Sequence, residues 1–339
     1  MTYRPQLDGI RALAILIVLF AHFAPPQWTK NPYASIGYLG VELFFVLSGF
    51  LITGILLGDR EAVATGQYTR WRSMTRFYLR RAVRIFPTYY LVLAFALAAG
   101  LGITKSSFGW FAAYLTNFYI VRHGPPGSST HLWSLAVEEQ FYLIWPMLVL
   151  FLRGRLLPAA LAAIGMGGLV FRHVAAFPYA DYLLFACLDY LAAGAALALV
   201  FRRSPAKLPL VLRWSLVVAA IAAAAALFVS GKTNWINTAF AALSVWLVGR
   251  AATGFGGPFG RWLQSPPMVY VGRISYGLYL YHLFIPEGLG KAAAFYGVEF
   301  SLSPIERLLV AALAFAIAAA SWHFVELPLQ RWRRSMRPL

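Results

Sequence analysis

The sequence predicts an all-α polytopic membrane protein, and its composition and patterning carry this prediction. The 339 residues are 60% hydrophobic and only 12% charged, whereas about a quarter of the residues of a soluble domain are charged. Apolar windows of about 20 residues, the length that crosses a bilayer as a helix, recur from end to end. The basic residues gather in alternate connections, as the positive-inside rule describes.

We therefore expect about ten transmembrane helices with both termini cytoplasmic. They are placed at residues 9–25, 36–58, 85–103, 133–152, 157–176, 182–201, 209–229, 234–253, 268–290 and 305–325. The net charge of +17 follows from this topology and gives no reason to expect nucleic-acid binding. No soluble module remains, so residues 1–339 are expected to form a single transmembrane domain without an appended extracytoplasmic domain.

Residues 59–84 form the most basic of the predicted cytoplasmic connections. Arg80, Arg81 and Arg84 share one face of a short basic amphipathic helix that runs into the third span. Clustered arginines suit a phosphate or pyrophosphate, which they bind through charge-assisted hydrogen bonds. An anchor in lipid headgroups is the alternative reading of the same face.

The first predicted span carries Arg11 and His22, residue types that a membrane helix normally avoids. Their offset comes within about 20° of three full turns, so both side chains share one face, roughly 16 Å apart along the axis. A charge at mid-bilayer costs about 2.5–3.5 kcal/mol on insertion scales, which makes such residues candidates for function. A snorkelling Arg11 and a packed His22 are the alternative.

The predicted orientation places further ionisable residues at the depth of His22, in the outer half of the bundle. They are Glu42, His131, Glu138, Glu139 and His282. A histidine beside a carboxylate is the usual general-base arrangement, so we expect Glu139 or Glu138 to orient His22. Adjacent helical residues point about 100° apart, so only one of the two glutamates should face the interior. The rest are candidate substrate-binding residues, although a helix-bridging hydrogen bond is the favoured reading of Glu42.

Several sequence blocks, in order from end to end, give the chain a specific resemblance. They are Leu7–Ala14 with the Arg11 and His22 pair, Gly40–Thr53, Arg80–Tyr90, His131–Pro146, Ile274–His282 and Val325–Pro328. Together they resemble the acyltransferase family 3 membrane proteins, the O-acetylases of surface polysaccharides, peptidoglycan and some antibiotics. The resemblance covers the whole chain.

The resemblance implies an O-acyltransferase of a bacterial inner membrane. The donor would be cytoplasmic acyl-coenzyme A, most often acetyl-coenzyme A, and the acceptor a hydroxyl of a carbohydrate or lipid-linked glycan at the far face. Catalytic function is carried onto Arg11, His22, Glu138, Glu139 and Tyr119, and coenzyme binding onto Arg11, Arg80, Arg81 and Arg84. Direct transfer and an acyl-enzyme on His22 or Tyr119 both remain open, as does the oligomeric state.

A different class of function is a secondary transporter or flippase for a lipid-linked glycan or small anion. Intramembrane histidine, glutamate and arginine also serve proton-coupled carriers. Against it, the sequence shows no interrupted helices at matching positions of two halves. A glycosyl- or phosphotransferase would need a metal-binding acidic cluster; none is visible, and no metal is expected.

Overall fold

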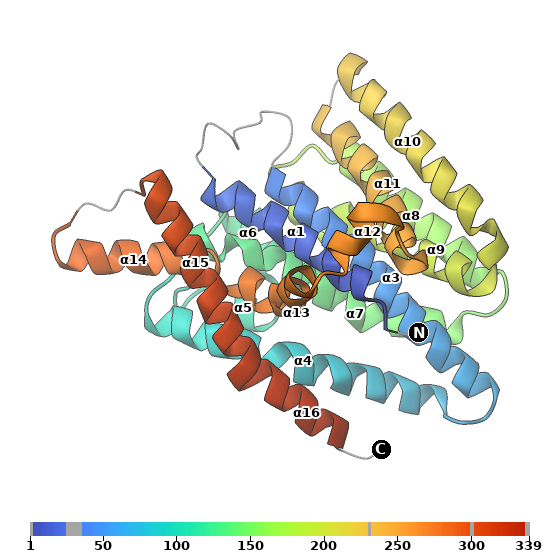
Figure 1. Ribbon diagram of the computed structural model, residues 1–339, viewed down its shortest axis with the longest axis horizontal. Helices are drawn as coiled ribbons and strands as arrows, with labels where there is room; N and C mark the ends of the chain where they lie inside the picture. The colour runs from blue at the N-terminus through green and yellow to red at the C-terminus, as the bar shows by residue number, and fades with distance from the viewer. Residues whose placement is uncertain (1–2, 25–35, 230–231, 299–301, 336–339) are drawn as a thin grey trace.

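The computed structural model describes residues 3–24, 36–229, 232–298 and 302–335, and every regular element in these ranges is helical (Figure 1). The long helices are α1 (Pro5–Phe23), α3 (Ile36–Ala64), α4 (Arg70–Ala98), α7 (Trp133–Phe151), α8 (Leu156–Val174), α9 (Leu184–Arg203), α10 (Leu208–Phe228), α11 (Lys232–Thr253), α13 (Pro266–Tyr281) and α15 (Pro304–Ser321). Shorter helices are α5 (Phe108–Ala112), α6 (Thr116–His123), α12 (Gly257–Leu263), α14 (Phe284–Phe295) and α16 (Leu327–Ser335). Single turns form η1 (Gly127–Leu132), η2 (Ala180–Tyr182), η3 (Pro205–Lys207) and the π-helical η4 (Trp322–Glu326).

Within these ranges, eight helices are long and apolar enough to cross a membrane, or nine if the pair α11 and α12, bent by 84°, forms one span. The chain is a multi-pass integral membrane protein. A helix coincides with each of the ten predicted spans, but the ninth, 268–290, is divided between α13 and α14. With 16 residues, α13 is shorter than the roughly 20 that a bilayer requires.

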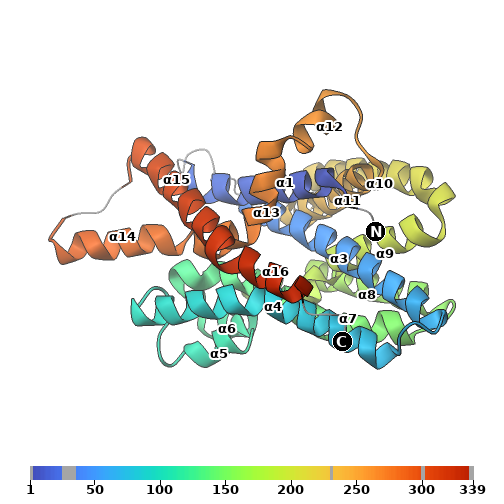
Figure 2. The same ribbon diagram turned by 60° about the horizontal axis from the view of Figure 1, so that its bottom comes forward.

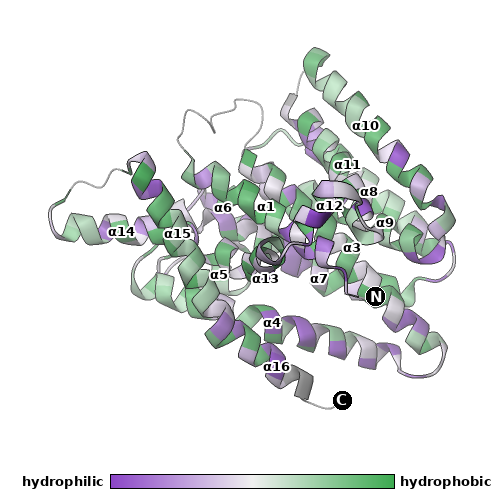
Figure 3. Cartoon of the chain, in the orientation of Figure 1, coloured by the Kyte–Doolittle hydropathy of each residue, from purple (hydrophilic) through white to green (hydrophobic). Residues whose placement is uncertain are grey.

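Residues 70–84 of the basic connection and most of the third predicted span form one continuous helix, α4. Thr69 caps its start, since the Thr69 hydroxyl accepts a hydrogen bond from the Arg72 amide at 3.1 Å. Hydrophilic residues recur along the N-terminal half of α4, while its C-terminal half is apolar (Figure 3). The arginines of this segment are therefore held on a rigid helix that leads directly into the bundle.

Helix α1 lies in the core of the bundle and packs against both α3 and α13, as the two ribbon views show (Figure 2). The crossing with α13 requires glycine, because a Cβ at Gly272 would lie 2.0 Å from the Asp8 carbonyl oxygen. The crossing of α3 and α9 is equally close, since a Cβ at Gly194 would lie 1.9 Å from the Val46 oxygen. Small residues of this kind allow membrane helices to approach closely.

Candidate functional site

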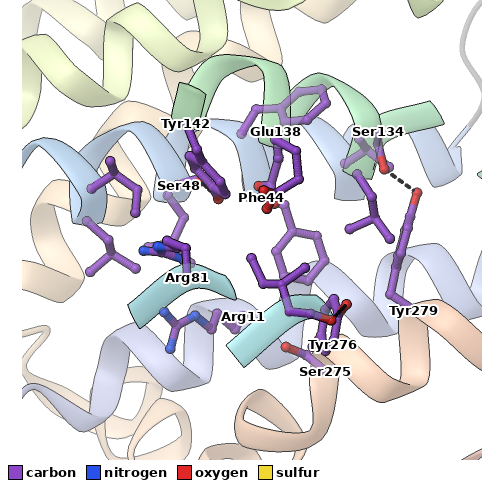
Figure 4. Close-up of a pocket in the computed structure, with 18 of the residues that line it drawn as sticks. Arg11, Phe44, Ser48, Arg81, Ser134, Glu138, Tyr142, Ser275, Tyr276 and Tyr279 are labelled. Carbon is purple, nitrogen blue, oxygen red and sulfur yellow. Dashed lines mark hydrogen bonds between the residues drawn. The ribbon is translucent and has the colours of Figure 1, made fainter. Parts of the chain in front are cut away.

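A cavity of about 110 Å³ lies between α1, α3, α4, α7 and α13 (Figure 4). Its polar lining residues are Arg11, Ser48, Arg81, Arg84, Ser134, Glu138, Glu139, Tyr142, Ser275, Tyr276 and Tyr279. Apolar side chains of α3, among them Phe44 and Leu51, line the space between them. Figure 4 shows Arg11 and Arg81 toward one end and the hydrogen-bonded pair Ser134 and Tyr279 at the other.

Three arginines, Arg11, Arg81 and Arg84, face the same cavity from two helices. Arg11 donates a hydrogen bond to the Asp8 carboxylate at 2.7 Å, and the Arg81 guanidinium lies 4.8 Å from the centre of the Tyr142 ring. Arg84 has both other guanidinium groups among its electrostatic neighbours. Such a concentration of fixed positive charge in a membrane protein favours an anionic ligand, and guanidinium groups bind phosphate oxygens in pairs.

Both glutamates of α7 line the cavity, so our expectation that only one would face the interior is wrong. The Glu138 carboxylate has Arg81, Tyr142 and Ser48 as its neighbours, and the Ser48 and Tyr142 hydroxyls lie 2.5 Å apart. Glu139 is next to Glu138 and also feels the charge of Arg81. Because the cavity extends across the surfaces of both α3 and α4, it meets two adjacent faces of α7.

The three predicted histidines meet in one cluster, which consists of His22, His131 and His282. The ring centre of His282 lies 4.9 Å from those of both His22 and His131. The His22 ring nitrogen Nδ1 lies 2.8 Å from the Val18 carbonyl oxygen. Among the described residues, no group of three histidine, cysteine or acidic side chains has a geometry that could hold a metal ion.

The expected pairing of His22 with a carboxylate is absent from the described part of the chain. Its hydrogen bond is to Val18 and its ring contact is with His282, while Glu138 and Glu139 lie in the cavity. Tyr279 separates the two groups, because it lines the cavity and its ring centre lies 5.6 Å from that of His282. A similar depth predicted from the sequence therefore did not imply contact.

Glu42, which was predicted to bind substrate, lies outside both the cavity lining and the histidine cluster. It is fully buried beside Arg172, Asp189 and Tyr190, in a cluster formed by α3, α8 and α9. Arg172 donates to the Asp189 carboxylate at 2.5 Å and lies 4.9 Å from the centre of the Tyr190 ring. Neither carboxylate oxygen of Glu42 has a partner at strict hydrogen-bond geometry among the described residues, but the Tyr190 hydroxyl of α9 is a hydrogen-bonding neighbour of this carboxylate. The helix-bridging interpretation of Glu42 therefore stays a prediction.

Two further predicted site residues lie away from the cavity. Arg80 is exposed on α4 and has Asp59 as an electrostatic neighbour. Tyr119 stacks on His123 with ring centres 4.6 Å apart, and it also contacts Trp110. In this conformation neither side chain reaches the cavity lining.

Glu326, which was not among the predicted site residues, lies near the arginines of the site without lining the cavity. It is 3% exposed, its carboxylate accepts a hydrogen bond from Ser321 at 3.4 Å, and it is an acidic neighbour of Arg84. The π-helical turn η4 presents it to the bundle. The available signal was an isolated acidic residue after a long apolar helix, together with the Val325–Pro328 block.

The fold and the cavity define a multi-pass membrane protein with an arginine-rich site inside its helical bundle. Residues 4–323 match the family model described as "Acyltransferase domain", and the chain belongs to this acyltransferase family.

Several curated proteins are similar in sequence. The peptidoglycan O-acetyltransferase OatA of Listeria monocytogenes is 29% identical over 97% of this chain and 56% of its own length. The O-acetyltransferase OatA of Staphylococcus aureus is 26% identical over 97% of this chain and 57% of its own length. A putative peptidoglycan O-acetyltransferase, YrhL of Bacillus subtilis, is 34% identical over 43% of this chain and 23% of its own length. Although nearly all of this chain matches the two OatA proteins, it spans only about half of their length. No solved structure matches the chain.

Proposed function

We propose that the protein is an O-acetyltransferase of the bacterial inner membrane, which moves an acetyl group from cytoplasmic acetyl-coenzyme A to a hydroxyl of a carbohydrate acceptor at the outer face. The observation that carries the proposal is the convergence of Arg11, Arg81 and Arg84 with Glu138 and Glu139 on one cavity. Family membership supports acyl transfer, and the names of the relatives support a peptidoglycan-type acceptor.

The arginines are proposed to bind the phosphates of the coenzyme. Arg81 and Arg84 are three residues apart on α4, so they present adjacent guanidinium groups, and Arg11 joins them from α1. Arg81 and Arg84 belong to the basic N-terminal half of α4, which the charge bias places on the cytoplasmic side. The negatively charged donor would therefore be attracted to the same end of the bundle from which it is supplied.

The thioester is proposed to extend through the cavity toward Ser134 and Tyr279. The Tyr279 hydroxyl is held there by the Ser134 hydroxyl at 2.6 Å and the His131 carbonyl at 2.8 Å. Because this ring stands between the cavity and the histidines, transfer to the outer face requires it to rotate aside. In this proposal Tyr279 acts as a gate between the donor and the histidines.

His22 is proposed to be the general base. A carbonyl oxygen only accepts hydrogen bonds, so the contact with Val18 places a hydrogen on Nδ1 and leaves the lone pair of Nε2 available. His22 Nε2 takes the proton of the acceptor hydroxyl as its oxygen attacks the thioester carbonyl. The carbon–sulfur bond breaks, the coenzyme leaves as its thiolate, and the proton from His22 then converts it to the thiol.

The test compares two neighbouring arginines in protein reconstituted in nanodiscs with labelled acetyl-coenzyme A and peptidoglycan fragments. Arg81→Gln should raise the KM for the donor about 10- to 100-fold, because a charge-assisted hydrogen bond contributes about 1.5–3 kcal/mol and 1.4 kcal/mol corresponds to tenfold. Arg80→Gln is the matched control, since Arg80 is exposed and outside the cavity, and its KM should stay near the wild-type value.

Two results would overturn the proposal. An unchanged KM in Arg81→Gln would mean that these arginines do not bind the coenzyme and would favour the alternative that they anchor the helix in lipid headgroups. Solute movement across the membrane without consumption of the thioester would support a carrier instead. His22→Ala should retain coenzyme binding and lose about 100- to 10,000-fold in turnover, the usual contribution of a general base.

A further inference from the structure

Among the described residues no carboxylate contacts His22, although a base that becomes a cation within a helical bundle needs a group to stabilise that charge. The polar side chain against it is His282, whose ring centre is 4.9 Å away. His282 is 0% exposed, and its Nε2 atom is buried without a hydrogen-bond partner among the described residues. An unpartnered buried acceptor beside the proposed base requires an explanation.

The backbone fixes the same tautomer in both rings. His22 Nδ1 lies 2.8 Å from the Val18 carbonyl oxygen, and His282 Nδ1 lies 2.8 Å from the Tyr279 carbonyl oxygen. Each Nδ1 must donate to its carbonyl, so each neutral ring keeps a lone pair on Nε2. Two lone pairs cannot bond to each other, but a single added proton can be shared between them.

The helix ends favour such a proton. His22 lies in the last turn of α1, and His282 is the C-cap residue of α13. The carbonyl groups at a helix C-terminus carry partial negative charge, which stabilises a cation. The C-terminal ends of α1 and α13 meet at this pair of histidines. Their dipoles therefore stabilise a positive charge on the pair, in part as a carboxylate would.

We propose that His282 is the proton-sharing partner of His22, so that the proton taken from the acceptor hydroxyl is held between the two Nε2 atoms. This inference rests on the proposed function of His22. In the transfer step the acceptor O–H bond breaks, and His22 Nε2 forms the new N–H bond. His282 Nε2 accepts a hydrogen bond from it, and the proton later passes to the departing thiolate. His282 acts through His22 and is a positioning residue.

The groups that face His282 are His22 from α1, His131 from η1, and Tyr279 of its own helix. His131 differs from the pair, because both its ring nitrogens lie against carbonyl oxygens, those of Ser128 at 2.7 Å and Leu280 at 3.2 Å. A neutral imidazole donates only one of these bonds, and its other nitrogen faces a carbonyl oxygen and not His282. His131 is the matched control for packing within the same cluster.

The kinetic test uses three variants of the full chain in nanodiscs. His282→Phe keeps a ring but removes the acceptor, and it should lower kcat about 10- to 100-fold with an unchanged KM for acetyl-coenzyme A. His282→Gln, whose amide oxygen can accept the hydrogen bond, should recover most of the loss. His131→Phe should lower thermal stability with a smaller effect on kcat. Equal kcat values in His282→Phe and His282→Gln would overturn the proposal.

A spectroscopic test separates the pair from the proposed catalysis. In protein labelled with ¹⁵N-histidine, acidification should move the Nε2 resonances of His22 and His282 together, and His22→Ala should abolish the response of His282. An unaltered His282 response in His22→Ala would rule out the shared proton, whatever the activity. Retained acetyl transfer in His22→Ala would instead overturn the proposed function while leaving this measurement valid.

Discussion

Replacement of Gly272 by alanine should show that one helix crossing sets the geometry of the whole site. Its new Cβ would lie 2.0 Å from the Asp8 carbonyl oxygen, whereas ordinary contact begins at 3.4 Å. Helices α1 and α13 must therefore separate by about 1.4 Å. Helix α1 carries Arg11 and His22, and His282 caps the end of α13. Separation of the two helices therefore moves these residues apart.

The expected cost has two parts. Overpacking of this kind destabilises a protein by about 1–3 kcal/mol, which should lower the Tm in a nanodisc unfolding assay. A misplacement of about 1 Å at a reacting centre can reduce turnover about 100-fold. Gly167→Ala is the matched control, because Gly167 is exposed on α8 with nothing within 4 Å of its Cβ position. It should leave kcat unchanged and should not lower the Tm, since alanine favours a helix more than glycine does. A Gly272→Ala protein with wild-type Tm and kcat would refute the reasoning.

Three other predictions follow from single contacts. Arg172→Met should destabilise the fold by about 3–5 kcal/mol, because it leaves the buried Asp189 carboxylate without its ion pair; recovery in Arg172→Met with Asp189→Leu would confirm the cause, and no recovery would contradict it. Glu138→Gln should tighten coenzyme A binding in a calorimetric titration, since Arg81 loses a competing carboxylate, and weaker binding would argue against this arrangement. Trp145→Phe should lower the free energy of unfolding by about 1–3 kcal/mol, because the buried bond from the indole to Thr53 at 2.8 Å is lost, and unchanged chemical denaturation would disprove that contribution.

The sequence was sufficient for the fold class and for most helix positions. A bilayer imposes one length and one polarity on each span, so apolar windows locate helices without knowledge of their neighbours. The break in the ninth predicted span escaped this reasoning. His282 and Leu283 separate α13 from α14, and Pro286, the third residue of α14, was the available signal. A proline cannot donate to the carbonyl four residues earlier, which is that of His282, and its ring clashes with this carbonyl.

The sequence also identified several groups of the site, but not all of their partners. The family resemblance grouped Arg11, Arg80, Arg81 and Arg84, and all of these except Arg80 line one cavity. Whether two residues at the same depth touch depends on which helices are neighbours, and the hydrophobic periodicity of the sequence does not reveal this. His22 was therefore assigned a glutamate at the same predicted depth, whereas the ring that contacts it belongs to His282.

The π-helical turn at Trp322–Glu326 makes this part of the chain intolerant of changes in length. Such a turn holds one residue more than an α-helical turn, and relatives can lose it only by deleting that residue. The deletion would swing Glu326 through about 100° and remove the acidic neighbour of Arg84. Variation among homologues at this point should consist of side-chain exchange, with gaps confined to the loops on either side.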